Sequence, residues 1–252
     1  MTLPRFYCPG EICTGKAIEL PASAAHHASR VLRLERSAKL ILFNGNGGEF
    51  LSVIAHIGKN VVTVIPEKHL DIERESQLVI TLAQAVCATE KMDWIIQKAV
   101  EMGVSRVQPL TTKLSVVKLT GERAERRMNH WQHVAVSACE QCGRNQIPQV
   151  LALTSLHAWL GMQASDDRKN ISADLHLMLS PGAKRSLRNF PGHSTSAAIN
   201  LLVGPEGGFT ADEEAAALVA GFAQLRLGPR ILRTETAALS AIAAIQTLWG
   251  DY

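Results

Sequence analysis

The stretch Ile199–Thr210, with the sequence INLLVGPEGGFT, constrains the fold of this chain more than any other. Ile199–Val203 is an apolar run of the type found in buried strands. The glycine-rich turn Gly204–Gly208 follows. Thr210 then stands three residues before Glu213, the spacing of a capping box, so a helix is expected to begin there. The stretch predicts a strand, a turn and a helix, an arrangement that presents backbone groups to a small ligand.

The composition of this turn argues against a phosphate-binding loop. No Lys-Ser or Lys-Thr follows the glycines, and the dinucleotide-binding glycine pattern is absent. Glu206 would also place a negative charge where a pyrophosphate would lie. A neutral or cationic cofactor fits the turn better. The alternative is a tight turn whose glycines merely adopt positive φ.

A second stretch, Leu225–Ala237 (LRLGPRILRTETA), has the same organisation. It begins as a short apolar strand and breaks at Gly228-Pro229. It then carries two arginines into a helix whose start is marked by Thr234 or Thr236. Two strand–loop–helix units so close in sequence predict one shared site at the carboxyl ends of their strands.

The two motifs, in this order and spacing, resemble the cofactor-binding end of the SPOUT superfamily of S-adenosylmethionine-dependent RNA methyltransferases. The chain is most similar to the bacterial 16S ribosomal RNA uridine-N3 methyltransferases. HHASRVLRL near the start, KMDWIIQKAVEMG in the middle and ACEQCGR after it extend the resemblance over nearly the whole chain.

The resemblance implies an α/β fold in two parts. Residues 75–252 would form a SPOUT-type parallel sheet with helices and a trefoil knot, and residues 1–70 a small PUA-like β-barrel domain that binds RNA. The implied activity is methylation of N3 of a specific uridine in the decoding region of 16S ribosomal RNA, with S-adenosyl-L-methionine as cofactor. Two alternatives stay open: a SPOUT enzyme acting on another RNA position, and a non-catalytic RNA-binding factor in ribosome assembly.

Charge and hydropathy agree with an RNA-facing protein. Residues 1–70 hold eight Lys and Arg against five Asp and Glu, whereas residues 71–252 hold eighteen of each. The net charge of +3 therefore lies in the first segment, where an RNA-binding module would carry it. No run approaches the ~18 apolar residues of a membrane span. The start lacks the apolar segment of a signal peptide, so we expect a cytoplasmic protein.

The first 70 residues predict a β-rich domain with one helix. Ala38–Phe43, Glu49–Ile57 and Asn60–Ile65 are strand-like runs separated by hairpin-type connections. Ala22–Leu34 is expected to be helical, with Val31, Leu32 and Leu34 packing inward. Either RNA phosphates or solvent could face the basic side chains of this helix. Our candidate RNA-binding residues are Arg5, His26, His27, Arg30, Arg33 and Arg144.

Beyond a charged linker at Pro66–Gln77, strands and helices alternate, as in an α/β domain. The expected strands are Leu78–Val86, Val104–Leu110 and Leu175–Leu179. The expected helices are Glu90–Met102 and Glu122–Cys142, and the expected loops are Ala164–Asp174 and Pro181–Ser196.

The polar residues around Gly143 could simply solvate a helix end, or, as the resemblance implies, face the active cleft. Cys139 and Cys142 lack a second pair at zinc-ligand spacing. We therefore interpret them as packing residues and expect no metal.

The last predicted helix, Glu235–Trp249, is apolar on nearly every side. Such a helix is buried on several faces. It either packs within its own monomer or, as the resemblance implies, forms part of a homodimer interface.

Methylation of uridine N3 requires removal of a proton or stabilisation of the developing anion over O2 and O4, which a carboxylate and an arginine can provide. The catalytic candidates are Arg233, Glu235 and Glu206. Apolar side chains of the two loops can enclose an adenine, and glycines allow close backbone approach. The cofactor-binding candidates are Leu202, Gly204, Glu206, Gly207, Leu227, Gly228, Ile231, Leu232 and Thr236.

Overall fold

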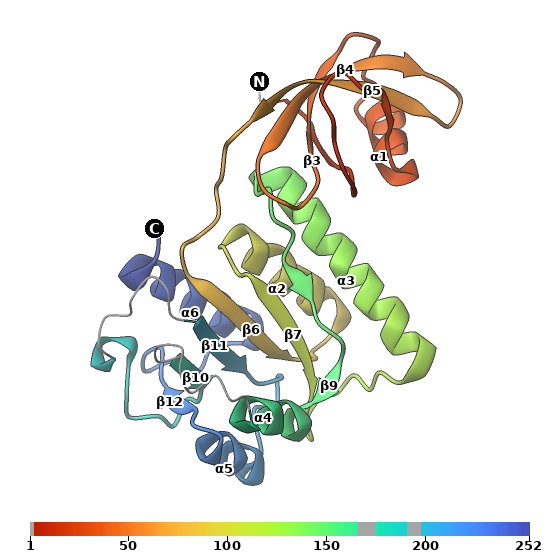
Figure 1. The fold of residues 1–252 in the computed structure, drawn as a ribbon. Coiled ribbons are helices and arrows are strands. Elements are labelled where there is room, and N and C mark those ends of the chain that lie inside the picture. The colour runs from red at the N-terminus through yellow and green to blue at the C-terminus, as the bar shows by residue number, and fades with distance from the viewer. Residues whose placement is uncertain (1–2, 166–174, 191–197) are drawn as a thin grey trace. The chain divides into compact units, whose positions relative to one another are not determined.

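The computed structural model describes residues 3–165, 175–190 and 198–252, and the chain divides into two compact units (Figure 1). The first unit contains the residues up to Glu75 together with Cys139–Ile147. The second contains Ser76–Ala138 and Pro148–Tyr252. The segment Cys139–Ile147 lies far along the chain from the rest of its unit, and the sequence gives no indication of this return.

The first unit is built on a five-stranded sheet with the order β1-β3-β4-β5-β2. Strands β1 and β3 are parallel and the other pairs antiparallel. The predicted strands are present, and β5 extends to Leu70, so the linker starts later than expected. The strands β1 and β2 were not predicted, because runs of two or three residues carry no periodicity. The bounds are β1 Arg5–Tyr7, β2 Ile18–Glu19, β3 Lys39–Phe43, β4 Glu49–Ile57 and β5 Val62–Leu70.

The helix of the first unit is shorter than predicted. It comprises α1 (Ala22–His26) and a π-helical turn, η1 (His27–Val31). The small residues Ala24, Ala25 and Ala28 face the core. The expectation that Val31 and Leu32 pack inward is wrong: they are 61% and 41% exposed. The π-helical turn ends the helix at this point, and only Leu34 of the expected trio packs against the core.

A buried ionic network ties the return segment into the first unit. Glu49 accepts hydrogen bonds from Arg5 and from Arg74, the latter at 2.9 Å. Arg5 also donates to the Asn145 side chain at 2.6 Å, and Arg144 pairs with Glu75, its Nε 2.9 Å from the carboxylate. These bonds link β1, β4 and the end of the long helix. They explain why residues far apart in sequence form one unit.

Cys139 lies in the same return segment and is fully buried. Burial raises the pKa of its thiol to about 12, so the thiol stays protonated at neutral pH. This environment suits the packing interpretation of the Cys139–Cys142 pair better than a redox role.

The second unit is a parallel α/β fold, as predicted. Its seven-stranded sheet has the order β12-β10-β11-β6-β7-β8, with β9 also paired to β7, and every pairing is parallel. The last strand ends at Leu225, before the apolar residue Leu227 that we expected it to include. The bounds are β6 Val79–Ala85, β7 Arg106–Thr111, β8 Gln149–Val150, β9 Thr154–Ser155, β10 Leu175–Leu179, β11 Ala198–Val203 and β12 Ala223–Leu225.

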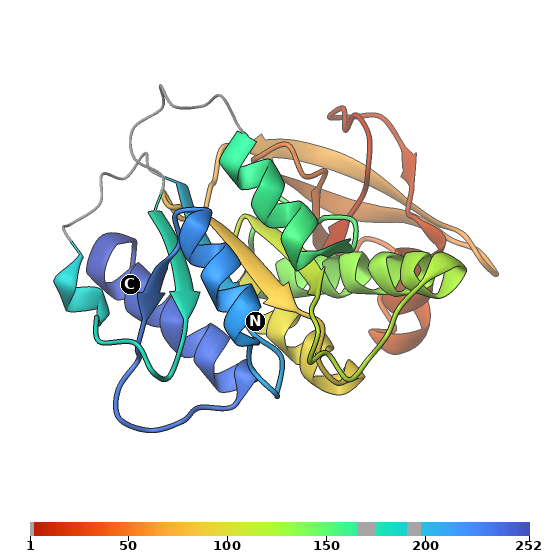
Figure 2. The same cartoon turned by 90° about the horizontal axis from the view of Figure 1, so that it is seen from below.

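Helices cover both faces of this sheet. Figures 1 and 2 show α4 and α5 on one face and α2 and α6 on the other. On the face covered by α4 and α5, a hydrophobic cluster that includes the buried residues Trp159, Met178 and Phe222 forms the core. Within the described residues, no helix is long and apolar enough to cross a membrane. The helices are α2 Thr89–Glu101, α3 Gly121–Cys142, α4 Leu156–Ser165, α5 Ala211–Val219 and α6 Thr234–Trp249, with a short 3₁₀ turn η2 at Leu187–Asn189.

Most predicted helices are confirmed, whereas α4 was not anticipated. The expected capping box is present: Thr210 accepts from the Glu213 amide, and the Glu213 carboxylate accepts from the Thr210 amide at 2.9 Å. The ends of the two expected loops, residues 166–174 and 191–196, lie outside the described residues. The trefoil knot stays a prediction.

Candidate functional site

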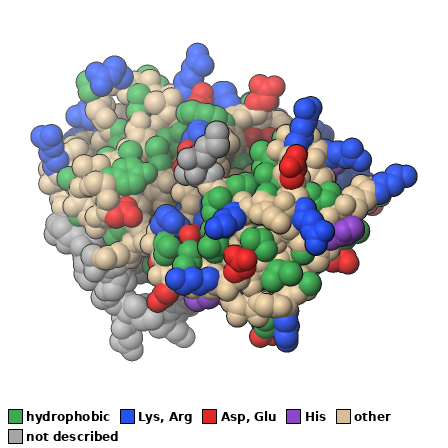
Figure 3. All heavy atoms as spheres, turned by 90° about the horizontal axis from the view of Figure 1, so that it is seen from above, with side chains coloured by type: hydrophobic (Ala, Val, Ile, Leu, Met, Phe, Trp, Pro, Cys, Tyr) green, Lys and Arg blue, Asp and Glu red, His purple; other side chains and the backbone are tan. Residues whose placement is uncertain are grey.

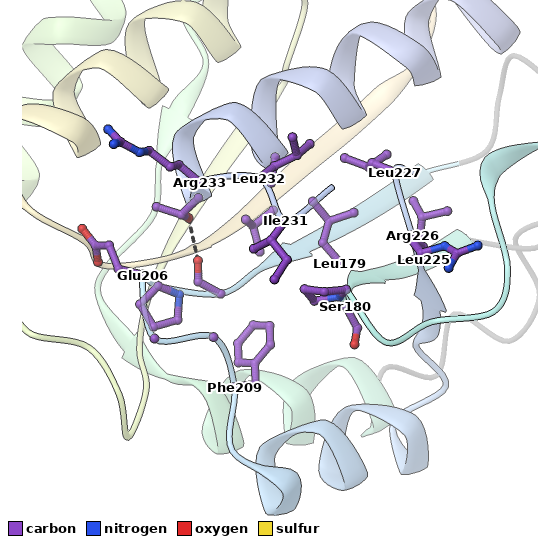
Figure 4. A pocket seen from close by; sticks show the side chains of 18 of the residues that line it. Leu179, Ser180, Glu206, Phe209, Leu225, Arg226, Leu227, Ile231, Leu232 and Arg233 are labelled. Carbon is purple, nitrogen blue, oxygen red and sulfur yellow. Dashed lines mark hydrogen bonds between the residues drawn. The ribbon is translucent and has the colours of Figure 1, made fainter. Parts of the chain in front are cut away.

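A cavity of about 640 Å³ lies beyond the carboxyl ends of β10, β11 and β12. The two predicted loops form most of its wall, and the end of β10 with the residues that follow adds Leu179, Ser180 and Pro181. Figure 4 shows these segments converging around one space. The size is typical of a small-molecule site. The prediction that two neighbouring strand–loop–helix units share a pocket is therefore confirmed geometrically.

Two glycines have specific conformational reasons to be there. A Cβ at Gly204 would lie 3.2 Å from the Phe209 ring and 3.3 Å from the Gly208 Cα, so a side chain there would require its neighbours to shift. Gly228 in the second loop has φ +132°, a backbone conformation that disfavours any other residue.

A buried hydrogen-bond chain holds the two loops together. The Thr234 hydroxyl, at the start of α6, donates to the Gly204 carbonyl at 2.6 Å (the dashed line in Figure 4). The same hydroxyl accepts from Gln84 Nε2 at 3.0 Å. Gln84 is fully buried at the carboxyl end of β6. The first loop, the second loop and the sheet are thus connected through one threonine.

Charged groups occupy one side of the cavity. Glu206 accepts hydrogen bonds from the Ala88 amide at 3.2 Å and from Lys91 at 3.1 Å. Burial alone would raise the pKa of Glu206, but backbone hydrogen bonds and the Lys91 ammonium outweigh it and hold the pKa below its usual value. Glu235, in the first turn of α6, lies 3.8 Å from Lys91, and its buried Oε2 accepts no hydrogen bond from any residue in the described ranges.

Arg230 and Arg233 also line the cavity, and both are exposed. Arg233 is the N-cap residue of α6, yet its side chain makes no capping hydrogen bond. Within the part of the chain that the structure describes, it has no ion-pair partner. Its guanidinium is therefore free to meet an anionic group at the mouth of the cavity.

The opposite side of the cavity carries several leucine side chains, and Arg226 also lies there. Figure 4 shows Leu179, Leu225 and Leu227 grouped away from Glu206 and Arg233, with Phe209 below. An elongated ligand with a flat apolar part and a charged part would match this division of the wall.

The structure brings most predicted loop residues together. The following line the cavity: Gly204, Glu206, Gly207, Leu227, Gly228, Ile231, Leu232 and Arg233. Three others lie outside the lining. Leu202 is fully buried in the core beneath it, Thr236 is exposed on α6, and Glu235 reaches the site only through Lys91.

The basic candidates of the first unit fall into two groups. His26, His27, Arg30 and Arg33 are exposed. Arg5 and Arg144 are engaged in the buried network around Glu49 and Glu75, with guanidinium donors that bond inside the unit. The second group is therefore less suited to contact RNA.

Sequence reasoning missed Lys91, Thr234 in its bridging role, and Gln84. Lys91 is 115 residues from Glu206 in sequence, and Gln84 is 150 residues from Thr234. A sequence clue is that Gln84 is a polar residue near the carboxyl end of a mostly apolar strand, the end at which ligands bind in parallel sheets.

Replacing Thr234 with valine is expected to destabilise the second unit by about 1–3 kcal/mol. Valine keeps the shape but removes a donor to Gly204 and an acceptor for Gln84, at a largely buried position. Urea unfolding monitored by tryptophan fluorescence measures the loss. The matched control is Thr247→Val, an exposed threonine of the same helix, for which a change below about 0.5 kcal/mol is expected. Equal stability of the two variants would contradict the bridging role.

Residues 74–246 match the family model described as an RNA methyltransferase domain, and residues 20–67 match the RNA methyltransferase PUA domain. Together with the fold and the site, these matches define the class of protein: an RNA methyltransferase with an appended PUA-type module.

Comparison with individual proteins narrows the class. The chain is 33% identical to ribosomal RNA small subunit methyltransferase E of Buchnera aphidicola (subspecies Schizaphis graminum), over 99% of this chain and 98% of that protein. A solved structure of the same enzyme from Neisseria gonorrhoeae, bound to S-adenosylmethionine, has a TM-score of 0.89 at 37% identity and covers both chains fully. A methyltransferase from Legionella pneumophila with the same bound cofactor has a TM-score of 0.92 at 37% identity, again over both whole chains. The chain belongs to the ribosomal RNA small subunit methyltransferase E family.

Proposed function

We propose that this protein transfers a methyl group from S-adenosyl-L-methionine to N3 of a specific uridine in 16S ribosomal RNA. The observation that carries the proposal is the cavity shared by the two loops, in which leucine side chains gather on one side and Glu206, Lys91 and Arg233 lie on the other. The two solved relatives that hold S-adenosylmethionine support the identity of the ligand.

The residues present fit this cofactor. The cavity has room for it, and Leu179, Leu227 and Ile231 offer an apolar wall for an adenine ring. The Glu206 carboxylate suits a cationic ligand and disfavours a polyphosphate. When bound, the cofactor supplies an electrophilic methyl group on a sulfonium that is already activated as a leaving group. The chain's own residues then need to orient the two reactants and manage the N3 proton.

We assign charge stabilisation to Arg233, whose guanidinium can meet the negative charge that develops over O2 and O4 of the uracil. A carboxylate would accept the N3 proton. Glu206 and Glu235 are both candidates for this role: Glu206 lines the cavity, whereas Glu235 lies outside the lining and pairs with Lys91. The hydrogen bonds from Ala88 and Lys91 stabilise the ionised form of Glu206, which weakens it as a base.

RNA contact is proposed for the exposed set His26, His27, Arg30 and Arg33, whose side chains can donate charge-assisted hydrogen bonds to phosphates. Lys and Arg side chains project from much of the face drawn in Figure 3, among apolar side chains and some acidic ones. The target base has to leave its stack to reach the cavity, which favours a loop or a distorted helix as substrate.

The proposal includes the small ribosomal subunit as the context of the substrate, a cytoplasmic location where that substrate lies, and a homodimer. The support for a dimer is α6, an apolar helix whose Leu248 is half exposed near its end. Contact between the α6 helices of two copies would bury this side chain.

The test is mass spectrometry of 16S ribosomal RNA from a strain that lacks the protein. We expect one N3-methyluridine to disappear and to return when the gene is restored. Loss of a methyl group from a different position would favour the alternative of another RNA target. If no modification is lost and calorimetry detects no S-adenosylmethionine binding, the non-catalytic assembly factor becomes the better account.

A further inference from the structure

Lys91 belongs to neither of the two loops, yet it lines the cavity that they form. It lies in the first turn of α2, which begins after Ala88. Its Nζ is 3.1 Å from Glu206 in the first loop and 3.8 Å from Glu235 in the first turn of α6. The side chain is 32% exposed, so water screens these pairs only in part. One ammonium group therefore links three separate elements of the second unit.

The two carboxylates depend on this cation to different degrees. Glu206 has a second donor, the Ala88 amide at the N-terminus of α2, where the helix dipole also favours a negative charge. Glu235 has one buried oxygen, Oε2, that accepts no hydrogen bond from the residues the structure describes, and the Lys91 ammonium lies 3.8 Å from it. A carboxylate oxygen buried in this way is unfavourable unless a cation compensates it.

We propose that Lys91 is a positioning residue for methyl transfer: by pairing with Glu206 and Glu235 at once, it fixes the first loop against the start of α6 and so gives the cavity its binding shape before either substrate arrives. The inference rests on the proposed function and deepens it, since it assigns part of the site to a helix outside the two cofactor loops.

The pairing also has a consequence for pH dependence. The groups that face Lys91 are Glu206 from the first loop, Glu235 from α6, and the buried Cys87 thiol just before α2. The Lys91 ammonium is one cause of the lowered pKa of Glu206. Without it that pKa rises, so the carboxylate becomes protonated at a higher pH as the solution is acidified. The acid limb of the activity profile should then move to higher pH.

The experiment compares Lys91→Met with Lys91→Arg in the full-length protein. For Lys91→Met we expect kcat/KM for S-adenosylmethionine to fall by about tenfold or more. The acid limb of its pH profile should also move to higher pH. The dissociation constant measured by calorimetry should rise as well. Arginine retains the charge, so Lys91→Arg should restore most of the binding and the wild-type acid limb.

The matched control is Lys98→Met. Lys98 lies on the same helix, is 34% exposed, and pairs with Glu101 at 2.8 Å away from the cavity, so its loss should change neither binding nor the pH profile. If Lys91→Met fails to fold, Lys91→Gln is measured in its place. A folded Lys91 variant with the wild-type dissociation constant and acid limb would overturn the proposal. Wild-type protein that neither binds S-adenosylmethionine nor methylates RNA would instead overturn the proposed function, so the two failures are distinguishable.

Discussion

Replacing Arg233 with alanine is expected to lower kcat for methyl transfer by about 10²–10³-fold without unfolding the protein. The guanidinium is exposed at the cavity, makes no capping hydrogen bond to α6 and, among the described residues, has no ion-pair partner. Its removal therefore breaks no capping hydrogen bond and no ion pair among the described residues. The negative charge that develops on the uracil would lose its proposed counter-charge.

The measurement uses a labelled methyl donor and small subunits from a strain that lacks the modification. Calorimetry with S-adenosylmethionine separates loss of cofactor binding from loss of chemistry. Arg233→Lys should recover part of the rate, because lysine retains the positive charge but lacks the planar guanidinium with its several hydrogen-bond donors. Arg123→Ala, an exposed arginine of α3 that does not line the cavity, is the control. A folded Arg233→Ala protein with full activity would remove Arg233 from the catalytic group.

The largest expected effect on stability is that of Glu49→Gln, which should destabilise the first unit by about 3–5 kcal/mol. Glu49 is only 4% exposed and compensates the mostly buried Arg5 as well as Arg74. Glutamine has nearly the same shape but no charge, so the Arg5 guanidinium would remain buried without its counter-charge. Arg74 is 43% exposed, and its pair with Glu49 contributes less.

Hydrogen exchange of the β3 and β4 amides measures this loss within the first unit. The control, Glu122→Gln, removes an exposed i,i+4 pair with Arg126 on α3 and should change stability by less than about 0.5 kcal/mol. If Glu49→Gln has the same free energy of exchange as wild type, the ionic network around Glu49 contributes no net stability.

The pairing of Glu49 with Arg5 and Arg74 also predicts how acidification changes the stability of the first unit. Burial would raise the pKa of Glu49, but the hydrogen bonds and charges of Arg74 and Arg5 outweigh it, so the pKa lies below its ordinary value. A lowered pKa in the folded state means that the stabilisation is present above the unfolded pKa of about 4.3 and is lost as the pH falls through the folded value. The difference in the free energy of unfolding of the first unit between wild type and Glu49→Gln should therefore be constant near neutral pH and shrink below about pH 4.

Local patterns in the sequence were sufficient for much of the fold. The strands β4 and β10 have the predicted bounds, and the capping box of Thr210 and Glu213 begins α5 as expected. These features depend on residues within a few positions of one another. The short strands β1 and β2 and the exposure of Val31 escaped prediction, because neighbours elsewhere in the unit decide them.

By itself, the sequence determined the class of fold and the convergence of two glycine-containing loops on one site, because parallel strands place their carboxyl ends along the same edge of a sheet. Tertiary structure alone decided which charged groups meet there. Lys91 reaches Glu206 across 115 residues, and Arg144 is drawn into the buried network of the first unit. The energy of an ion pair depends on distance and burial in space, and neither is encoded in the spacing of residues along the chain.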